Sequence, residues 1–334
     1  MQHHYQHDRD WSKLYPELLQ LISKHILDIF DFVHFRAVCK GWRTATLNSD
    51  YSQQPWLFWQ HGKEDGANFY MLTSTYQWTI FKVPIICMEK WIRGSSQGYL
   101  LIMDWKKWAY YLLNPITGKE IHLPPLDERF YNLADVELDE GVPKFVAVCE
   151  TVLGRCSPIL RICQIGDEKW TTVYRMYNSE CMVTFYKSSV LIISEFGSKV
   201  IDEKPGVPVS IIAPLKTKSR IRLCNPCGNA SKLVGISVND PLEFEFMLFE
   251  IYLLDHENNN TRWTKTNNIG DQVVFWNWGS CICWKIDNFS VYKRNSVYYR
   301  TFKGLGRFDI ENATAEILQR EPPDGHEWFT PNLV

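Results

Sequence analysis

The feature that most limits the possible folds of this chain is a long series of short apolar runs separated by turns. Runs of this kind, rich in Val, Ile, Tyr and Phe and bounded by polar, Gly or Pro residues, are typical of antiparallel β-strands. No helical patterns alternate with them, so a parallel doubly wound sheet is not favoured. All-β architecture is therefore predicted for most of the chain. The runs are GYLLIMD (98–104), WAYYLLNP (108–115), KFVAVCE (144–150), PILRICQI (158–165), MVTFYK (182–187), VLIIS (190–194), KLVGISV (232–238), FMLFEIYLLD (246–255), QVVFW (272–276) and SVYYRTF (296–302).

Composition agrees with this prediction. The 334 residues suffice for one large or two ordinary domains, and 14% of them are aromatic, including 14 Trp. Large flat side chains pack well on pleated sheets. The 36 Lys and Arg residues balance the 38 Asp and Glu residues and form no long block, so the charge pattern does not indicate a nucleic-acid-binding protein.

The segment 14–45 has a different, helical periodicity. In its second half one stripe at i, i+3, i+4 and i+7 comprises Phe35, Val38, Cys39 and Trp42. In its first half an apolar arc of roughly 160°, at about 100° per residue, comprises Leu18, Leu19, Leu21, Ile22 and Ile26. A unit of about forty residues cannot bury so broad a face by itself, so we expect a partner site there. The alternative is that these helices pack on the β-rich body.

A Trp-Thr pair follows a polar turn three times, at Trp78, Trp170 and Trp263. The first two lie 92 residues apart and the last two 93, which is close to twice the roughly 40 to 50 residues of a four-stranded propeller blade. Two blades per interval predict a β-propeller of about six blades. The alternative is that Trp fills the core of another β fold.

Ten cysteines are present, most of them inside strand-like runs, and we expect buried free thiols in a reducing compartment. Four of them could in principle ligate one zinc ion: Cys224, Cys227, Cys281 and Cys283. A structural zinc site normally shows two knuckles of two-to-four-residue spacing, whereas the C-x-C spacing puts two side chains on one face of a strand. Thiols are therefore the favoured interpretation, and no metal or cofactor is expected.

The N-terminus, MQHHYQHDRDW, has no apolar core of the kind that a secretory signal needs. No stretch reaches the roughly 18 apolar residues of a membrane span. We therefore expect the protein in the cytoplasm, the nucleus or both. Residues 1–9 are predicted to be a disordered tail, in which His3, His4 and His7 are at best a weak metal chelator.

Sequence motifs for catalysis are lacking. The chain has no Gly-x-Ser-x-Gly elbow, P-loop, His-Glu-x-x-His helix or dinucleotide fingerprint. The carboxylate pairs Asp127–Glu128 and Asp139–Glu140 fall in polar loops and are interpreted as solvated turn residues. Because propellers also host enzymes, an enzymatic propeller stays an alternative.

Aromatic residues cluster near a Gly turn in QVVFWNWGSCICWK (272–285). Trp is common at interface hot spots, so Trp276 and Trp278 are the candidate substrate-binding residues. Packing between sheets is the favoured alternative for both. Strand alternation would place them on one face of a strand and Phe275 on the other.

The sequence LYPELLQLISKHILDIFDFVHFRAVCKGWRTA (14–45) resembles the F-box, with its Leu-Pro start, Glu-Leu-Leu helix, apolar middle and Val-Cys-Lys-x-Trp ending. One departure is Tyr15, which stands where most F-boxes carry the first proline, although Pro16 is kept. The resemblance implies binding to a Skp-type adaptor and, through it, to a cullin ubiquitin ligase. It also implies that the adaptor-facing residues are among Leu14, Pro16, Leu18, Leu19, Ile22, Val38, Cys39 and Trp42.

A second resemblance covers most of residues 70–320. YYLLNPITGKEIHLPPL (110–126) is similar to the strand, Asn-Pro-x-Thr-Gly turn and Leu-Pro-Pro ending in early blades of plant F-box proteins of the kelch-like group. IGDEKWTTV, IGDQVVFW, SVYYRTF and GRFDIENATAEI resemble a plant F-box family whose C-terminal region is a domain of unknown function. The stretch FWNWGSCICW departs from the Phe-Leu-Gly and Ser-containing strand usual in that family.

These patterns and resemblances predict an α+β multidomain chain. A small helical F-box unit is expected at 10–50 and an all-β propeller that binds substrate at 68–320. A linker is expected between them at 51–67, and a C-terminal tail at 321–334. The expected function is that of a substrate-recognition subunit of a Skp-cullin-F-box ubiquitin ligase, a non-catalytic adaptor that binds a protein substrate but no nucleic acid, membrane or cofactor. The alternatives are a non-ligase protein-binding scaffold and, less favoured, a propeller enzyme.

Overall fold

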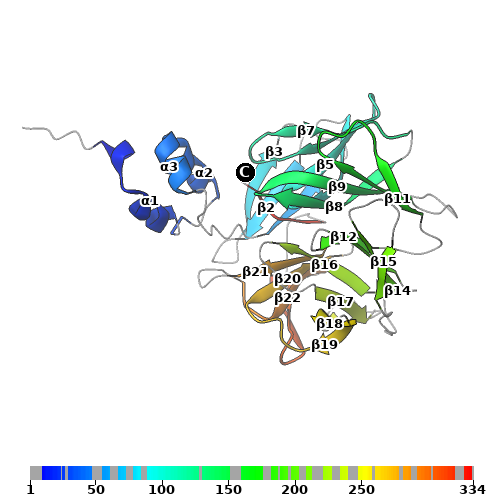
Figure 1. Ribbon diagram of the computed structural model, residues 1–334. Helices are drawn as coiled ribbons and strands as arrows, with labels where there is room; N and C mark the ends of the chain where they lie inside the picture. The colour runs from blue at the N-terminus through cyan, green and yellow to red at the C-terminus, as the bar shows by residue number, and fades with distance from the viewer. Residues whose placement is uncertain are drawn as a thin grey trace, which may run out of the picture. The chain divides into compact units, whose positions relative to one another are not determined.

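The chain divides into one unit up to Gln53 and a second from Gln54 to Asn332. The computed structural model describes residues 10–23, 25–26, 29–46, 55–60, 67–72, 78–83, 89–127, 130–150, 159–175, 182–186, 189–194, 197–202, 208–212, 221–227, 234–239, 247–257, 260–277, 281–286, 292–301, 304–319 and 327–332 (Figure 1). The predicted tail at residues 1–9 lies outside these ranges.

The first unit is helical, as its periodicity predicts. A short 3₁₀ turn, η1, begins after Asp10, whose side chain accepts a hydrogen bond from the backbone N–H of Ser12 at 3.1 Å. α1 starts at Pro16, whose fixed φ suits the first helical turn, and Glu17 lies at the positive end of the helix dipole. The elements are η1 Trp11–Lys13, α1 Pro16–Ser23, α2 Ile29–Ala37 and α3 Lys40–Ala45.

The second unit consists of strands in the described ranges, grouped into five sheets (Figure 1). The first sheet has the order β25-β1-β2-β3, from Glu327–Phe329, Trp56–Gln60, Ala67–Leu72 and Trp78–Val83. The second is β4 Lys90–Ser96, β5 Tyr99–Asp104, β6 Ala109–Leu113 and β7 Glu120–His122. The third is β8 Tyr131–Asp139, β9 Val142–Glu150, β10 Ile159–Gln164 and β11 Thr171–Arg175. The fourth is β12 Met182–Tyr186, β13 Ser189–Ser194, β14 Gly197–Asp202 and β15 Pro208–Ile212.

The fifth sheet has nine strands in the order β19-β18-β17-β16-β21-β20-β22-β23-β24. Its strands are β16 Ile221–Cys227, β17 Val234–Asn239, β18 Leu248–Glu257, β19 Asn260–Thr266, β20 Gln272–Trp276, β21 Cys281–Lys285, β22 Ser296–Thr301, β23 Gly304–Asp309 and β24 Thr314–Gln319. The first strands of successive sheets lie side by side, β25 beside β4, β4 beside β8, β8 beside β12 and β12 beside β16. This succession is the arrangement of a β-propeller.

The predicted propeller is therefore present, but with five sheets instead of about six blades. The fifth sheet combines an antiparallel group, β16–β19, with the group β20–β24, in which β20 and β22 pair in parallel. They share one sheet because β16 and β21 pair in parallel, with Pro226 opposite Cys283. A parallel pairing between segments so far apart in the chain leaves no local sequence pattern.

The Trp-Thr repeat lies on comparable strands of alternate sheets. Trp78 begins β3, Trp170 directly precedes β11, and Trp263 lies in β19. Each of these three strands is the outermost of its antiparallel group. The interval of two blades inferred from the repeat is thus confirmed.

The ring is closed by the last strand. β25 pairs antiparallel with β1, with Trp328 opposite Leu57. The indole N–H of Trp328 donates to the carbonyl oxygen of Trp276 in β20 at 3.2 Å, and the hydroxyl of Ser95 in β4 donates to the carbonyl oxygen of Trp328 at 3.2 Å. β25 thereby connects the first, second and fifth sheets.

Two of the expected connecting segments contribute to this closure. β1 lies within the predicted linker at 51–67, and β25 lies within the predicted tail at 321–334, so both assignments were wrong at these strands. A three-residue strand carries no periodicity, and only its pairing with β1 makes it recognisable.

Asn332, three residues beyond the end of β25, holds neighbouring turns together. The side-chain amide of Asn332 donates to the carbonyl oxygens of Gln97 at 3.3 Å and Gly141 at 3.0 Å. Its own carbonyl oxygen accepts from the side-chain amide of Asn114 at 2.9 Å. Gly98, in the β4–β5 turn, has a φ of +81°, and a Cβ added there would lie 2.7 Å from the backbone nitrogen of Asn332.

A buried carboxylate connects the inner strands of three sheets. Asp135 in β8 accepts hydrogen bonds on one oxygen from Ser96 Oγ at 2.5 Å and the N–H of Val136 at 2.8 Å. On its other oxygen it accepts from Thr184 Oγ1 at 2.8 Å and the N–H of Phe185 at 2.9 Å. Burial raises the pKa of Asp135, and these four donors oppose that rise.

The cysteines of the described strands are mainly core residues. Cys163, Cys281 and Cys283 are buried, and burial raises the pKa of Cys163 to about 12. Cys281 and Cys283 share one hydrophobic cluster while Ile282 belongs to another, so the expected same-face arrangement is confirmed. The side chains of Cys224 and Cys227 lie outside the described set, so the zinc alternative stays untested.

Replacing Gly98 with Ala should weaken ring closure. The substitution combines a left-handed φ with a clash against the backbone of Asn332, and we expect it to cost about 3 kcal/mol of stability. Gly118→Ala is the matched control, because Gly118 also has a positive φ, +72°, but nothing lies within 4 Å of its added Cβ. That variant should lose only about 1 kcal/mol. Thermal unfolding of both proteins measures the difference, and equal losses would contradict the closure role.

Replacing Asp135 with Asn should also destabilise the propeller. An amide places a donor where the carboxylate accepts. In one orientation the N–H of Phe185 loses this acceptor, and in the other the N–H of Val136 keeps only its 3.3 Å bond to Ser96 Oγ. We expect a loss of about 2–3 kcal/mol. The matched control is Asp139→Asn, an exposed position in the same strand. Urea unfolding that shows no difference between the two variants would refute a structural role for the carboxylate.

Candidate functional site

The helical unit has a very small core of its own. Within its described residues, the large apolar side chains that are fully buried are Leu19 in α1 and Phe32 in α2, both 2% exposed. Trp42 in α3 is half-buried, and its ring packs on Phe35 at a centroid distance of 4.5 Å. The three helices therefore hold together around few side chains.

Trp42 also fixes the start of the unit. Its indole N–H donates to the carbonyl oxygen of Trp11 at 3.0 Å, which joins α3 to η1. The hydroxyl of Thr46 donates to the carbonyl oxygen of Trp42 at 2.9 Å and to that of Arg43 at 3.2 Å, which ties the end of α3. The bond between Trp42 and Trp11 sets the position of η1 against α3.

The outer surface of the unit is unusually apolar. Eleven large hydrophobic side chains are exposed in the described part of the chain, and six of them belong to this small unit: Trp11, Tyr15, Leu18, Leu21, Ile22 and Val38. Leu18, Leu21 and Ile22 follow the i, i+3, i+4 spacing of one helix face. We call these six residues the apolar face. Exposed apolar clusters of this kind mark partner sites.

The structure distributes the predicted adaptor-facing residues among three environments. Leu18, Ile22 and Val38 are exposed by 46%, 42% and 55%, and Pro16 is exposed as well. Leu14, Cys39 and Trp42 are half-buried. Leu19 lies in the core of the unit, where it supports the apolar face instead of forming it.

Sequence reasoning omitted Trp11, Tyr15 and Leu21 from the candidate contacts. Leu21 was part of the recognised apolar arc, so its periodicity was a usable signal. Tyr15 was treated only as a departure from the usual proline, and Trp11 stands before the helical pattern begins. Their exposure is visible only once η1 and α1 are placed.

Basic side chains accompany the apolar face on α2 and α3. The Arg36 guanidinium lies 5.9 Å from the centroid of the Phe32 ring, and Lys40 and Arg43 are exposed. Burial, together with the nearby Arg43, lowers the pKa of Arg36. A partner with acidic residues at this side of the unit would be attracted electrostatically.

The two candidate substrate-binding residues are not a surface site in the described structure. Trp276 is 1% exposed and packs on Phe249 at a centroid distance of 5.5 Å, in the core of the fifth sheet. A side chain so deeply buried offers no area to a substrate, so packing is its role. Trp278 lies outside the described residues.

Of the carboxylates expected in polar loops, Asp139 lies instead at the exposed end of β8, Glu140 lies in the turn after it, and Glu128 is outside the described residues. Asp127 pairs with Arg161 at 2.7 Å and accepts a hydrogen bond from the Tyr131 hydroxyl at 2.6 Å. Burial, with the Asp127 hydrogen bond, raises the pKa of Tyr131 far above its usual range. A phenol held in its neutral form beside a paired carboxylate is a structural arrangement, not one poised for proton transfer.

The described residues contain no group of three or more His, Cys, Asp or Glu side chains that could hold a metal ion. None of the helices described here is long and apolar enough to cross a membrane.

Comparison with known proteins places both parts of the chain. The KIB1-4 beta-propeller family matches residues 69–321. A putative F-box protein of Arabidopsis thaliana is 23% identical over 96% of this chain and 93% of its own length. A second protein of that plant, F-box only protein 7, is 28% identical over 36% of this chain and 31% of its own.

Two further matches are more limited. A putative F-box/kelch-repeat protein of A. thaliana is 54% identical over 11% of this chain and 10% of its own length. Among solved structures, TolB from Acinetobacter baumannii aligns with 88% of this chain and 70% of its own, with 10% identity and a TM-score of 0.47, a likeness too distant to inform function.

The family match covers most of the strands described above, and the relatives are plant F-box proteins. The chain is therefore a plant-type F-box protein that belongs to the KIB1-4 beta-propeller family.

Proposed function

We propose that this protein is the substrate-recognition subunit of a Skp-cullin-F-box ubiquitin ligase. The helical unit docks on a Skp-type adaptor, and the adaptor connects the chain to a cullin. The propeller captures a protein substrate for ubiquitination. The observation that carries the proposal is the apolar face on a helical unit whose sequence matches the F-box at both ends.

The apolar face suits a stable protein contact. Leu18, Leu21 and Ile22 project from one side of α1, and Val38 follows α2. A fully buried large apolar side chain contributes about 1.5–3 kcal/mol, so covering several of these residues would offset the entropic cost of association. The interior residues Leu19 and Trp42 hold the helices in the geometry that presents this face.

The proposed role of this chain is to position a substrate, not to catalyse ubiquitin transfer. The relatives with F-box names support an adaptor role, and the paired or buried carboxylates described above suit structure better than catalysis. Ubiquitin transfer would then be performed by other subunits, without a cofactor in this chain. The proposed place of action is the cytoplasm, the nucleus or both.

Substituting Leu18 with Asp should abolish adaptor binding without unfolding the unit. Leu18 is exposed, so the change removes contact area and introduces a charge at the interface while the core keeps Leu19 and Phe32. We expect binding of the full chain to a Skp-type adaptor to fall by at least about thirtyfold. Titration of purified adaptor into wild-type and variant proteins gives the two affinities.

The matched control is Leu248→Asp, because Leu248 is similarly exposed, by 51%, but lies in β18 of the propeller. It should bind the adaptor as the wild-type protein does, and both variants should keep the wild-type thermal midpoint. Absence of adaptor binding by the wild-type protein would instead favour a protein-binding scaffold outside the ligase.

A further inference from the structure

The propeller carries a row of three packed aromatic rings, of which Trp91 and Trp108 are exposed while Phe130 is half-buried and also packs against the core of the second and third sheets. Phe130 stacks on Trp91 at a centroid distance of 6.1 Å and an interplanar angle of 21°, and it packs against Trp108 at 5.7 Å. Trp91 is 43% exposed and Trp108 is 37% exposed. We call these three residues the aromatic shelf. Clustered exposed aromatic rings are candidate interaction sites.

The pairing of the second sheet brings these distant residues to one edge. Trp91 lies near the start of β4, where Lys90 pairs with Asp104 at the end of β5. Asp104 pairs in turn with Ala109 at the start of β6, so the turn that contains Trp108 lies at the same edge. Phe130 directly precedes β8, the neighbouring inner strand. The shelf therefore lies on one end of the second and third sheets.

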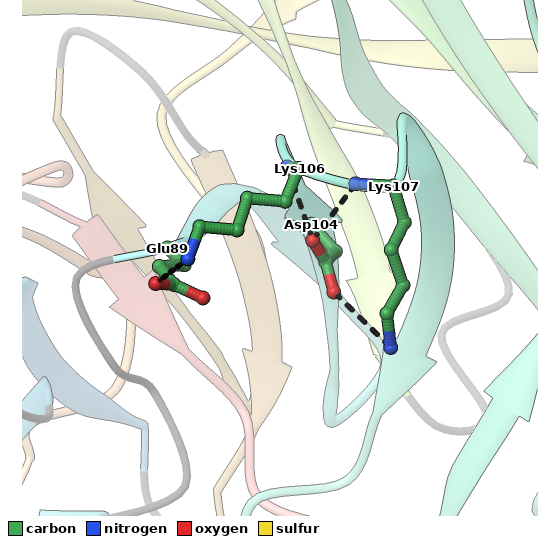
Figure 2. Close-up of polar contacts among 4 residues, drawn as sticks. All are labelled: Glu89, Asp104, Lys106 and Lys107. Carbon is green, nitrogen blue, oxygen red and sulfur yellow. Dashed lines mark hydrogen bonds and ion pairs between the residues drawn. The ribbon is translucent and has the colours of Figure 1, made fainter.

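The turn between β5 and β6 is fixed by its first residue. Asp104 accepts hydrogen bonds on one oxygen from the backbone N–H groups of Lys106 and Lys107, each at 3.2 Å. Its other oxygen lies 3.8 Å from Lys107 Nζ, and Lys106 forms an ion pair with Glu89 (Figure 2). The turn thereby presents two lysines between Trp105 and Trp108, both of which are exposed.

The two lysine side chains extend from the turn in different directions (Figure 2). Both are exposed to solvent, and so is the Glu89 partner in large part. Ion pairs in such surroundings are worth little, about 0–1 kcal/mol. Lys106 can therefore exchange Glu89 for a carboxylate of a bound partner at small cost. Lys107 is 79% exposed while its partner Asp104 is only 13% exposed, so a bound carboxylate would add to that contact instead of replacing it. We call residues 104–108 the basic turn.

A cation packs on one ring of the aromatic shelf. The guanidinium of Arg93 lies 5.6 Å from the centroid of Phe130, and its Nε–H donates to the carbonyl oxygen of Tyr131 at 3.2 Å. Lys90 is adjacent to Trp91 in β4 and packs on Tyr111, with Nζ 5.2 Å from the ring centroid, so it belongs to the other face of the sheet. The cations near the shelf are therefore Arg93, Lys106 and Lys107, and the carboxylates that interact with them are Glu327, Glu89 and Asp104.

Exposed aromatic rings next to lysines favour some of the ligands that aromatic surfaces bind over others. A quaternary ammonium or a basic peptide would be repelled by the surrounding cations. An acidic segment would be attracted, and a flat side chain on it could pack on the exposed indoles in the way that aromatic-lined grooves bind proline-containing peptides.

We propose that the aromatic shelf and the basic turn bind an acidic peptide segment that carries an aromatic or proline side chain. This proposal rests on the proposed function only for the source of the peptide, which would be a protein destined for ubiquitination. The contact residues are Trp91, Phe130, Trp108, Lys106 and Lys107.

Selection from a randomised peptide library displayed on phage tests the proposal with the full chain. Panning on the wild-type protein should enrich sequences with an excess of Asp and Glu around a Trp, Tyr, Phe or Pro. The same panning on Lys106→Glu/Lys107→Glu should lose them. The matched control is Lys285→Glu/Lys293→Glu, which makes the same charge change at two exposed positions elsewhere in the propeller and should enrich the wild-type sequences.

The affinities of an enriched peptide for two variants then show whether the aromatic shelf and the basic turn each contribute to binding. Fluorescence anisotropy should show at least a tenfold weaker affinity, about 1.4 kcal/mol, for Trp108→Ala and for the paired lysine variant, and an unchanged affinity for Leu248→Ala. The lysine variant changes only exposed side chains, so its result does not depend on whether the Trp variant folds. Enrichment that is basic, absent, or unchanged in the lysine variant would overturn the proposal.

Two further measurements distinguish other outcomes. Trp-dependent binding to vesicles of phosphatidylcholine and phosphatidylserine, without acidic peptide enrichment, would make the surface a membrane contact and overturn the peptide assignment. Adaptor binding by the lysine variant should match the wild type. If the wild-type protein bound acidic peptides but not the adaptor, the proposed ligase role would fail while the peptide site would stand.

Discussion

Closure of the propeller by β25 is the constraint on which the rest of the second unit depends. Each sheet of a propeller packs only against its neighbours, so the first and last sheets must be joined for the ring to persist. Here a three-residue strand near the end of the described chain pairs with β1, while Trp328 contacts β20 and Asn332 joins turns of the second and third sheets. Closure fixes the inner strands, and with them the edge at which the aromatic shelf forms.

Local sequence patterns predicted the β-propeller architecture well, but they did not predict how the ring of sheets is closed. The apolar runs predicted strands, and the Trp-Thr repeat marked β3, β11 and β19 as equivalent positions. The strands β1 and β25 were assigned to a linker and a tail, because Trp56–Gln60 and Glu327–Phe329 are short and are specified by each other. The parallel pairing of β16 with β21 likewise depends on long-range contact, which is why the expected number of blades differs from the five sheets.

The apolar face could be predicted from the sequence in part, whereas the aromatic shelf could not. Helical periodicity and the F-box resemblance indicated the apolar face, although Leu19 is part of the core and Trp11 and Tyr15 were not among the expected contacts. Trp276 attracted attention as an aromatic residue and is buried. Trp91, Trp108 and Phe130 have no shared spacing in the sequence and meet only through strand register. The aromatic shelf could therefore be found only from the structure.

Hydrogen–deuterium exchange of the full chain, with and without a Skp-type adaptor, tests the central claim of two separate binding parts. The account predicts that adaptor binding slows exchange in residues 14–45, around α1 and the start of α3, and leaves exchange in residues 90–131 of the propeller unchanged. Slower exchange confined to the propeller strands, or no change in the helical unit at saturating adaptor, would contradict it.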